Sequence, residues 1–324
     1  MVFIPLLLVS ALRGPNVGTD TENYLYGFKL IKEAAFNEVF NVVRYEPGYV
    51  LLVKFISLLV DHEQVLLIVT SIIVLIGIFI FIYLNSPNVM LSVFLYLALY
   101  LYFFSFNGVR QAIAMSIVVS GFHYILERKF LKYLLIIILA SLFHQTSIIF
   151  IIFYFFYGIK VNLKNVFFIL GVFSIMFFYL ESIIKFAVSF FDGLSYLLNT
   201  SLLSNSGGLL FPIINLAVLI FILYIKYQNK VEDRKLDLMI YIVLFGFLTS
   251  VLAIKIYILL RFVYYFFTYY IVAIPYAISF VKGKKEKITL ISLVTIFGSI
   301  YMLVRLTNGW HNVTPYNFFN LIIP

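Results

Sequence analysis

Cysteine is absent from this chain of 324 residues, and charged residues are scarce at 11%. Without cysteine, a disulfide framework, a thiol nucleophile and a cysteine-ligated metal site are all excluded. The four histidines are scattered and form no HxxxH pair, so we expect no zinc centre and no bound metal. In ordinary soluble domains about a quarter of the residues are charged. The low share of charged residues in this chain therefore argues against a soluble globular protein.

Apolar residues fill the chain instead, at 64% of the sequence and with a mean hydropathy of +1.08. A transmembrane helix needs about 20 apolar residues, so the length leaves room for about nine or ten spans. The sequence therefore predicts an all-α, polytopic integral membrane protein, organised as a single transmembrane domain over residues 1–324.

Several apolar runs are long enough to cross a bilayer. We expect spans at about 65–84, 89–106, 107–126, 164–180, 209–225, 236–254, 262–281 and 288–304. Residues 2–12 provide only about half a span, and we interpret them as an incomplete first helix. Residues 48–60 contain Lys54 and are too short to cross, which favours an interfacial or re-entrant helix.

The net charge of +9 does not indicate a nucleic-acid partner, because the lysines gather in short turns between apolar runs. Such turns are typical of cytoplasmic loops. Basic turns at 128–132, 160–164, 226–235 and 282–287 then place the longest loops, about 13–47 and 181–208, on the outer side. The second of these is rich in Gly, Ser and Asn over 192–208, which suits either a mobile lid or an ordinary surface loop.

A broken helix pair is predicted around His144. Only about 26 residues separate the basic turns at 127–132 and 160–164, so each half reaches about 20 Å of a hydrocarbon core of about 30 Å. The polar cluster at 143–147 marks the turn between the halves. Broken helices at membrane depth are tolerated where they face protein or water, so we expect His144 to line an outward-facing cavity.

Arginines on the outer side are exceptions to the positive-inside pattern. Either they anchor helices at the headgroup level, or they bind an anion, since guanidinium groups bind phosphate in bidentate fashion. Arg110 opens a predicted helix, whose N-terminus favours phosphate. Arg261 shares a helix face with Tyr264 and Tyr265, a pattern that an aromatic belt also produces. The remaining outer arginines are Arg13, Arg44 and Arg305.

Two acids in the first outer loop allow two interpretations. Asp20 stands where it could cap the following helix, and Glu46 precedes Pro47 at another helix start. Acids that face a cavity together with arginines would also suit a glycosyl acceptor site. His144 is likewise either a general base or a structural group at the helix break.

Several motifs occur in a specific order: Leu12-Arg13, then residues 17–21 (VGTDT), 45–49 (YEPGY), 107–114 (NGVRQAIA) and 139–147 (LASLFHQTS), with Pro315-Tyr316 in the tail. On these motifs the chain resembles the EpsG family, grouped with the Wzy-type polymerases of O-antigen, capsule and exopolysaccharide. The motifs cover about the first half of the chain, and the second half matches mainly by hydropathy. Such proteins generally have a full first helix before the arginine, which residues 2–12 do not provide.

The resemblance implies a glycosyltransferase in the bacterial cytoplasmic (inner) membrane that joins polyprenyl-diphosphate-linked oligosaccharide repeat units on the outer face, without a cofactor. A chain-length regulator and a flippase of the same pathway are possible protein partners. His144 is the first candidate for the base, followed by Asp20 or Glu46. The residues expected to bind diphosphate or sugar are Arg110, Arg261, Arg13, Arg44, Gln111, Tyr264 and Tyr265. A flippase or exporter of the lipid-linked sugar, or a polysaccharide ligase, would use the same residues.

Overall fold

The computed structural model describes residues 2–190 and 208–319. Within these residues the regular secondary-structure elements are all helices. In addition, one isolated antiparallel bridge pairs Arg13 with Phe318. The expected all-α fold is confirmed. The helices form two compact units, residues 1–154 with 288–324 and residues 155–287, and each is described by itself. The expectation of a single transmembrane domain stays a prediction.

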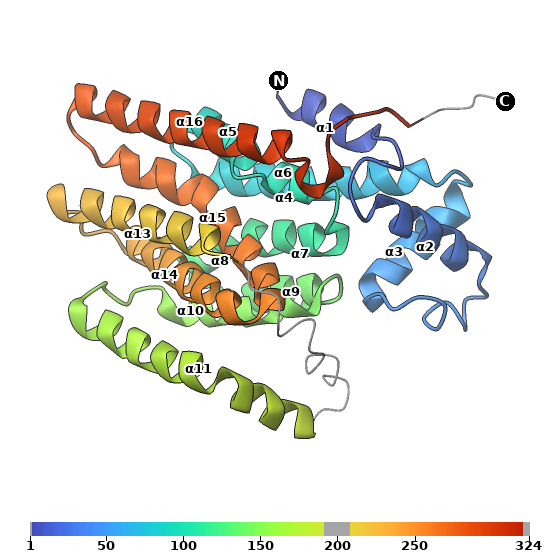
Figure 1. The fold of residues 1–324 in the computed structure, drawn as a ribbon, viewed down its shortest axis with the longest axis horizontal. Coiled ribbons are helices and arrows are strands. Elements are labelled where there is room, and N and C mark those ends of the chain that lie inside the picture. Colours follow the sequence, from blue (N-terminus) through green and yellow to red (C-terminus); the bar gives the residue numbers. More distant parts are fainter. Residues whose placement is uncertain (1, 191–207, 320–324) are drawn as a thin grey trace. The chain divides into compact units, whose positions relative to one another are not determined.

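The first unit contains the helices of the N-terminal half and most of the last long helix. Its elements are α1 (Phe3–Ala11), α2 (Thr21–Glu33), α3 (Pro47–Leu59), α4 (Gln64–Asn85), α5 (Val89–Ala98), α6 (Leu101–Phe104), α7 (Val109–Ser120), α8 (Phe122–Leu126), α9 (Phe130–Ser141), η1 (Gln145–Ile152), α16 (Lys284–Thr307) and η4 (Trp310–Asn312). α4 packs against α1 and α7, α7 packs against α9, and α2 and α3 lie side by side (Figure 1).

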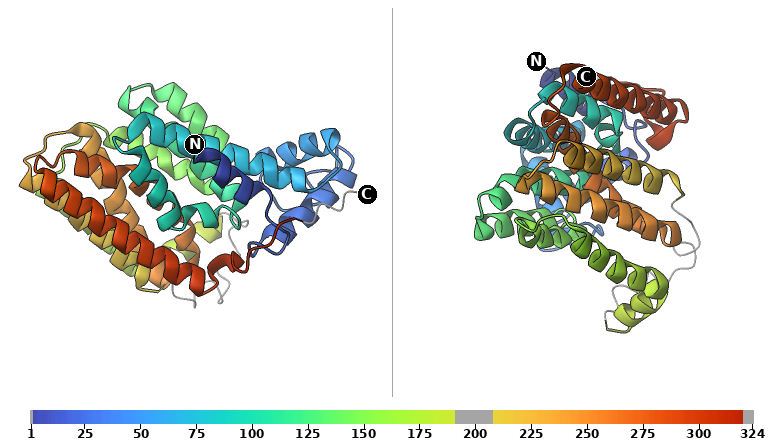
Figure 2. Two further views of the ribbon diagram at one scale, coloured as in Figure 1. Left: turned by 90° about the horizontal axis from the view of Figure 1, so that it is seen from above. Right: turned by 90° about the vertical axis from the view of Figure 1, so that its left-hand side faces the viewer.

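The second unit is built on long helices. It contains α11 (Leu163–Phe190), α13 (Leu210–Gln228), α14 (Arg234–Lys255), η3 (Tyr257–Leu259) and α15 (Leu260–Ser279). Helices α13, α14 and α15 contact one another, and Figures 1 and 2 show them side by side. The short helix α10 (Phe153–Phe156) lies at the boundary between the two units.

Seven helices in the described residues are long and apolar enough to cross a membrane. They are α4, α7 with α8, α11, α13, α14, η3 with α15, and α16. Six of them match an expected span to within about five residues, whereas α11 begins as expected but continues beyond the expected end at residue 180 to Phe190. The remaining expected span, 89–106, is instead two helices, because Tyr100 adopts a left-handed conformation (φ 66°) between α5 and α6. Four shorter apolar helices complete the set, and whether they raise the number of spans to the expected value stays a prediction.

The helix break expected at His144 is present. α9 ends at Ser141, His144 has an extended backbone (φ −157°, ψ 111°), and the 3-10 helix η1 follows at once. The first half therefore has 12 residues, which at about 1.5 Å per residue is too short to cross a bilayer. The outer loop predicted for 181–208 is wrong over 181–190, which is helical because α11 continues to Phe190. The lid predicted for 192–208 lies almost wholly outside the described residues.

The structure shows how the charge of Lys54 is accommodated in the apolar helix α3. It is buried within α3, and its Nζ donates to the backbone oxygens of Ile31, Lys32 and Ala34 at 3.2, 3.0 and 2.7 Å. These carbonyls belong to the C-terminal end of α2, where helix hydrogen bonds are missing and the dipole is negative. The lysine thus fixes α3 against α2.

Candidate functional site

The first turn of α3 positions Glu46. The helix begins at Pro47, a residue favoured there because its missing N–H is not needed. Glu46 occupies the N-cap position with an extended backbone (φ −65°, ψ 146°), yet its side chain makes no capping hydrogen bond. The helix-start interpretation therefore explains the backbone but not the carboxylate.

The carboxylate of Glu46 instead joins Arg110 and His144, and we call these three residues the Glu46 cluster. Nη1 of Arg110 forms an ion pair with Oε2 of Glu46. Nδ1 of His144 lies 2.9 Å from Oε1 of the same carboxylate. The side chains of Glu46 and His144 are each 11% exposed and that of Arg110 is 23% exposed. Three residues that the sequence selected separately thus form one mostly buried group.

The protonation of the cluster follows from its contacts. Burial raises the pKa of the Glu46 carboxyl, but the hydrogen bond with His144 and the charge of Arg110 together lower that pKa below its ordinary value. An ionised carboxylate only accepts hydrogen bonds, so Nδ1 of His144 carries the proton between the two groups. In the neutral imidazole the acceptor lone pair then lies on Nε2.

Some polar atoms of the site are buried without a hydrogen-bond partner among the described residues. They include Nε2 of His144, Nε of Arg110 and the hydroxyl of Tyr49. Buried polar groups in folded proteins are nearly always hydrogen-bonded. The cluster thus offers an acceptor and donors that a polar ligand would satisfy.

A close backbone approach brings Glu46 and His144 together. The N–H of Gly48 donates to the carbonyl of Leu142 at 2.9 Å. A Cβ on Gly48 would lie 2.7 Å from Cβ of Leu142 and 2.8 Å from its carbonyl oxygen, distances that real side chains avoid. Only glycine therefore lets the start of α3 touch the end of α9.

Aromatic rings surround the arginine of the cluster. The guanidinium of Arg110 lies over the ring of Tyr45, 4.6 Å from its centroid, in a cation–π contact. Tyr45 packs against Tyr24 and Tyr49 at centroid distances of 5.9 and 5.4 Å. Burial raises the pKa of the Tyr24 phenol, and the neighbouring Arg110 charge opposes part of this rise. The rings hold the guanidinium from one side while Glu46 holds it from another.

The motif at 17–21 is tied to the loop that precedes Arg110. The hydroxyl of Thr19 donates to Oδ1 of Asn107 at 2.6 Å. The hydroxyl of Thr21 donates to the backbone oxygens of Val17 and Phe106 at 2.7 and 3.2 Å. Gly18, at φ +101°, adopts a conformation that side chains disfavour. These contacts fix the start of α7, from which Arg110 projects.

A family model described as the EpsG family matches residues 1–318. The chain belongs to the EpsG family. No curated protein and no solved structure matches it. The resemblance drawn from the ordered motifs is therefore confirmed, and it places the chain among membrane proteins associated with exopolysaccharide biosynthesis.

The other predicted site residues of this EpsG-family protein differ in how far they are exposed to solvent. In the first unit, Arg13 and Gln111 are buried, whereas Arg44 and Asp20 are exposed. Asp20 occupies the N-cap position of α2 but makes no side-chain capping bond, so the first of its two interpretations is not supported and the second stays a prediction. Arg44 lies in the loop two residues before Glu46.

Arg261, Tyr264 and Tyr265 belong to the second unit of the EpsG fold. Arg261 is exposed near the start of α15, Tyr264 contacts the ring of Phe211, and Tyr265 is buried. Their part in a diphosphate site stays a prediction. In the part of the chain that the structure describes, no group of three His, Cys, Asp or Glu side chains could hold a metal ion.

The sequence did not single out the tyrosine group or Asn107 as parts of the site. Tyr45 precedes α3 and Tyr49 lies in its first turn, and both stand in the motif at 45–49, which was the available signal; that their rings pack together is seen only in the fold. Tyr24 belongs to another helix, α2, and Asn107 is linked to the motif at 17–21 by its hydrogen bond with Thr19. Neither contact can be read from the sequence, and only the fold shows that these residues lie at the site.

Proposed function

We propose that this protein is a polymerase that joins polyprenyl-diphosphate-linked oligosaccharide repeat units on the outer face of the bacterial cytoplasmic membrane. One observation carries the proposal: Glu46 accepts from Nδ1 of His144, so that the buried Nε2 is free to accept a proton. A carboxylate that orients a histidine in this way is a recurring arrangement for a general base.

The proposed reaction forms one glycosidic bond. The hydroxyl oxygen of the acceptor sugar attacks the anomeric carbon of the donor, and its proton passes to Nε2 of His144. The bond between that carbon and the diphosphate oxygen breaks, and the lipid diphosphate leaves with the electron pair. The growing chain is the donor, and a new lipid-linked unit is the acceptor.

Positive charge must stabilise the leaving diphosphate as its charge develops. Arg110 suits this role because it is fixed by Glu46 and by the ring of Tyr45, so little reorganisation is needed during the reaction. Its Nε has no partner among the described residues. Arg13 is a second cation of the same unit and is fully buried. Guanidinium groups supply this stabilisation without a metal ion.

The test is polymerisation of a purified polyprenyl-diphosphate-linked repeat unit by the reconstituted protein in the presence of EDTA. We expect a ladder of products from the wild type. His144→Ala should reduce the rate by about 10²- to 10⁴-fold, the usual contribution of a general base. Arg110→Lys should also reduce it, because lysine keeps the charge but loses the planar fork.

His123→Ala is the matched control. It removes a histidine of the same unit whose Nδ1 contacts the backbone of Ser120 and not the cluster. It should retain the wild-type rate within about twofold. If His144→Ala produces the same ladder at the same rate as the wild type, His144 is not the general base. Translocation of the authentic substrate without a ladder would instead indicate a flippase, and transfer of finished polymer to another acceptor a ligase.

A further inference from the structure

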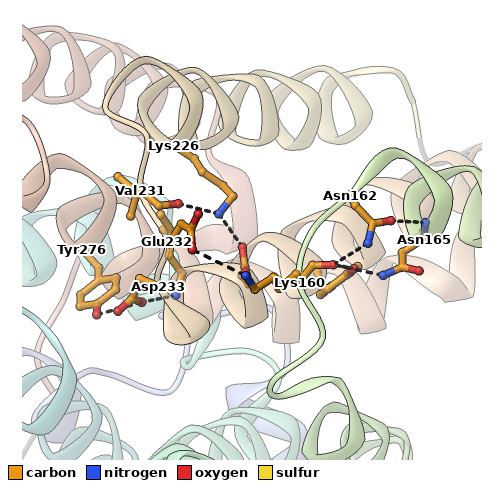
Figure 3. Close-up of polar contacts among 11 residues, drawn as sticks. Lys160, Asn162, Asn165, Lys226, Val231, Glu232, Asp233 and Tyr276 are labelled. Carbon is orange, nitrogen blue, oxygen red and sulfur yellow. Dashed lines mark hydrogen bonds and ion pairs between the residues drawn. The ribbon is translucent and has the colours of Figure 1, made fainter.

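The second unit contains a cavity of about 470 Å³ that the proposed function does not use. It opens at the turn between α13 and α14 and at the segment before α11, and Figure 3 shows the polar side chains around it. The lining residues are Lys160, Val161, Lys226, Tyr227, Lys230, Val231, Glu232, Asp233, Arg234 and Asp237. Both segments are basic turns of the kind that the positive-inside rule places on the cytoplasmic side.

The acids of the cavity already have partners. Oδ1 of Asp237 lies 2.8 Å from Nζ of Lys226, and both side chains are buried. Asp233 accepts from the N–H of Leu236 at 2.7 Å and from the hydroxyl of Tyr276 at 3.2 Å. Figure 3 shows Asp233 beside Tyr276. Lys226 therefore neutralises Asp237, whereas the donors to Asp233 are uncharged and leave its negative charge in place. The four cations of the lining still outnumber its three acids by one.

The remaining acid, Glu232, is only weakly engaged. Its carboxylate lies 3.6 Å from Nζ of Lys160, and the two side chains are 85% and 77% exposed. Exposed pairs of this kind contribute little, about 0 to 1 kcal/mol. An anion could therefore compete with Glu232 for Lys160.

Two cations at the cavity have no acidic partner among the described residues. Lys230 and Arg234 are both exposed, and no ion pair links either of them to a carboxylate. Arg234 is the first residue of α14. With Lys160, these side chains leave the rim of the cavity positively charged. That charge can bind an anion without first breaking an established buried pair.

The two segments that present these cations are held in place. The carbonyl of Lys160 accepts from Nδ2 of Asn162 and of Asn165 at 3.4 and 3.1 Å, and from the hydroxyl of Tyr241 at 3.0 Å. The other turn is closed by Nζ of Lys226, which donates to the carbonyl of Val231 at 2.8 Å (Figure 3). Such ordering reduces the entropy that a ligand must overcome on binding.

We propose that this cavity binds a phosphate group, that of an anionic phospholipid at the cytoplasmic surface. Arginine and lysine bind phosphate oxygens through charge-assisted hydrogen bonds. Basic pockets between membrane helices on this side of the bilayer meet anionic headgroups. The proposal does not depend on the polymerase assignment, since its residues lie outside the Glu46 cluster.

The test uses the full-length protein in nanodiscs and compares Lys230→Gln/Arg234→Gln with the matched pair Lys282→Gln/Lys284→Gln. The control pair removes the same charge from exposed lysines of another basic turn. Retention of phosphatidylglycerol is measured by native mass spectrometry, with phosphatidylcholine as the neutral reference. We expect the first pair to lose about 30-fold in affinity, the loss for two basic residues at about 1 kcal/mol each. The control pair should lose less than about threefold.

A second arm adds inorganic phosphate to protein in phosphatidylcholine nanodiscs and measures the melting temperature. Stabilisation by phosphatidylglycerol alone supports the lipid headgroup as the ligand. Equal stabilisation by inorganic phosphate, lost in Lys230→Gln/Arg234→Gln, supports the phosphate site but overturns the lipid as its source. Equal losses in the two variant pairs would show general attraction to the basic surface, and no loss in either would show that these cations do not bind the headgroup. Either result would overturn the proposal.

Discussion

Each unit of the protein contains a buried ion pair, and the two pairs differ in how the chain makes them. Lys226 and Asp237 lie on α13 and α14, two helices that follow one another through a short turn. Glu46 instead meets Arg110 and His144 across 64 and 98 positions of sequence. The first pair closes a local hairpin. The second draws three distant segments to one point, which local folding does not require.

The polar atoms around the two pairs differ as well. Lys226 also donates to Val231, and its turn is closed by that bond. Oδ1 of Asp237 is buried without a hydrogen bond, but it lies 2.8 Å from the ammonium of Lys226. In the Glu46 cluster, by contrast, Nε2 of His144 and Nε of Arg110 are buried with neither a hydrogen bond nor an ion pair among the described residues. Buried polar groups without partners cost about 1–3 kcal/mol each, so a protein that keeps them needs a reason other than stability. We infer that the pair in the second unit is structural and that the cluster in the first serves a ligand.

Removing the acid from each pair should give the largest effects. Asp237→Asn leaves Lys226, only 10% exposed, as a buried charge without its partner, and we expect a loss of about 3–5 kcal/mol in the free energy of unfolding. Glu46→Gln should cost less, about 2–3 kcal/mol, because Arg110 is 23% exposed and keeps its contact with Tyr45. Reversible unfolding in mixed micelles measures both. A larger loss for Glu46→Gln would reverse the comparison and make the cluster the stabilising pair.

Glycine substitutions extend the comparison to packing. Gly48→Ala should cost about 1–3 kcal/mol, the usual effect of overpacking, because its Cβ would collide with Leu142. It should also reduce polymerisation by moving Glu46 away from His144. Gly171→Ala, in α11 of the second unit, is the matched control, since a Cβ there meets nothing within 4 Å.

The control variant should be neutral or stabilising by up to about 1 kcal/mol, the helix-propensity gain from glycine to alanine. The melting temperature and the polymer length are measured for both Gly48→Ala and Gly171→Ala, and only Gly48→Ala should lower both. Normal activity of Gly48→Ala would show that the close approach to Leu142 is not needed for the chemistry.

The sequence predicted most of what depends on local pattern. Long apolar runs gave the long helices, because apolar length decides which helices can span a bilayer. The polar stretch at His144 gave the break between α9 and η1, which the structure confirms. Glu46, Arg110 and His144 were each selected from their own motif. Their meeting could not be predicted, since no local rule relates positions that lie in three separate segments.

Lys54 shows what a charged residue in an apolar run does not reveal by itself, although the interfacial or re-entrant helix expected there stays a prediction. A lysine inside an apolar run favoured an interfacial helix, because charge in a membrane is costly. The structure satisfies its ammonium with the carbonyl oxygens of Ile31, Lys32 and Ala34. The reason for the charge thus lies in α2, on a different part of the chain. Asp20 shows the reverse case, since its position allowed a cap that its side chain does not form.

Acidification should give the smallest effect, and it tests the electrostatics of the Glu46 cluster directly. The pKa of Glu46 in the folded protein lies below its ordinary value of 4.5, because contacts with His144 and Arg110 outweigh the opposing effect of burial. A carboxyl whose pKa is lowered by folding stabilises the protein fully above its unfolded pKa, and this contribution disappears as the pH falls through the folded pKa.

The free energy of unfolding of the wild type, minus that of Glu46→Gln, should therefore decrease as the pH falls below about 5. The difference is the quantity to measure, because the other carboxyl groups titrate equally in both proteins. Only the part of the interaction that depends on ionisation is lost, so the change should be smaller than that caused by the substitution itself. A difference that increases on acidification would mean that folding raises the pKa of Glu46, which would contradict the electrostatics inferred for the cluster.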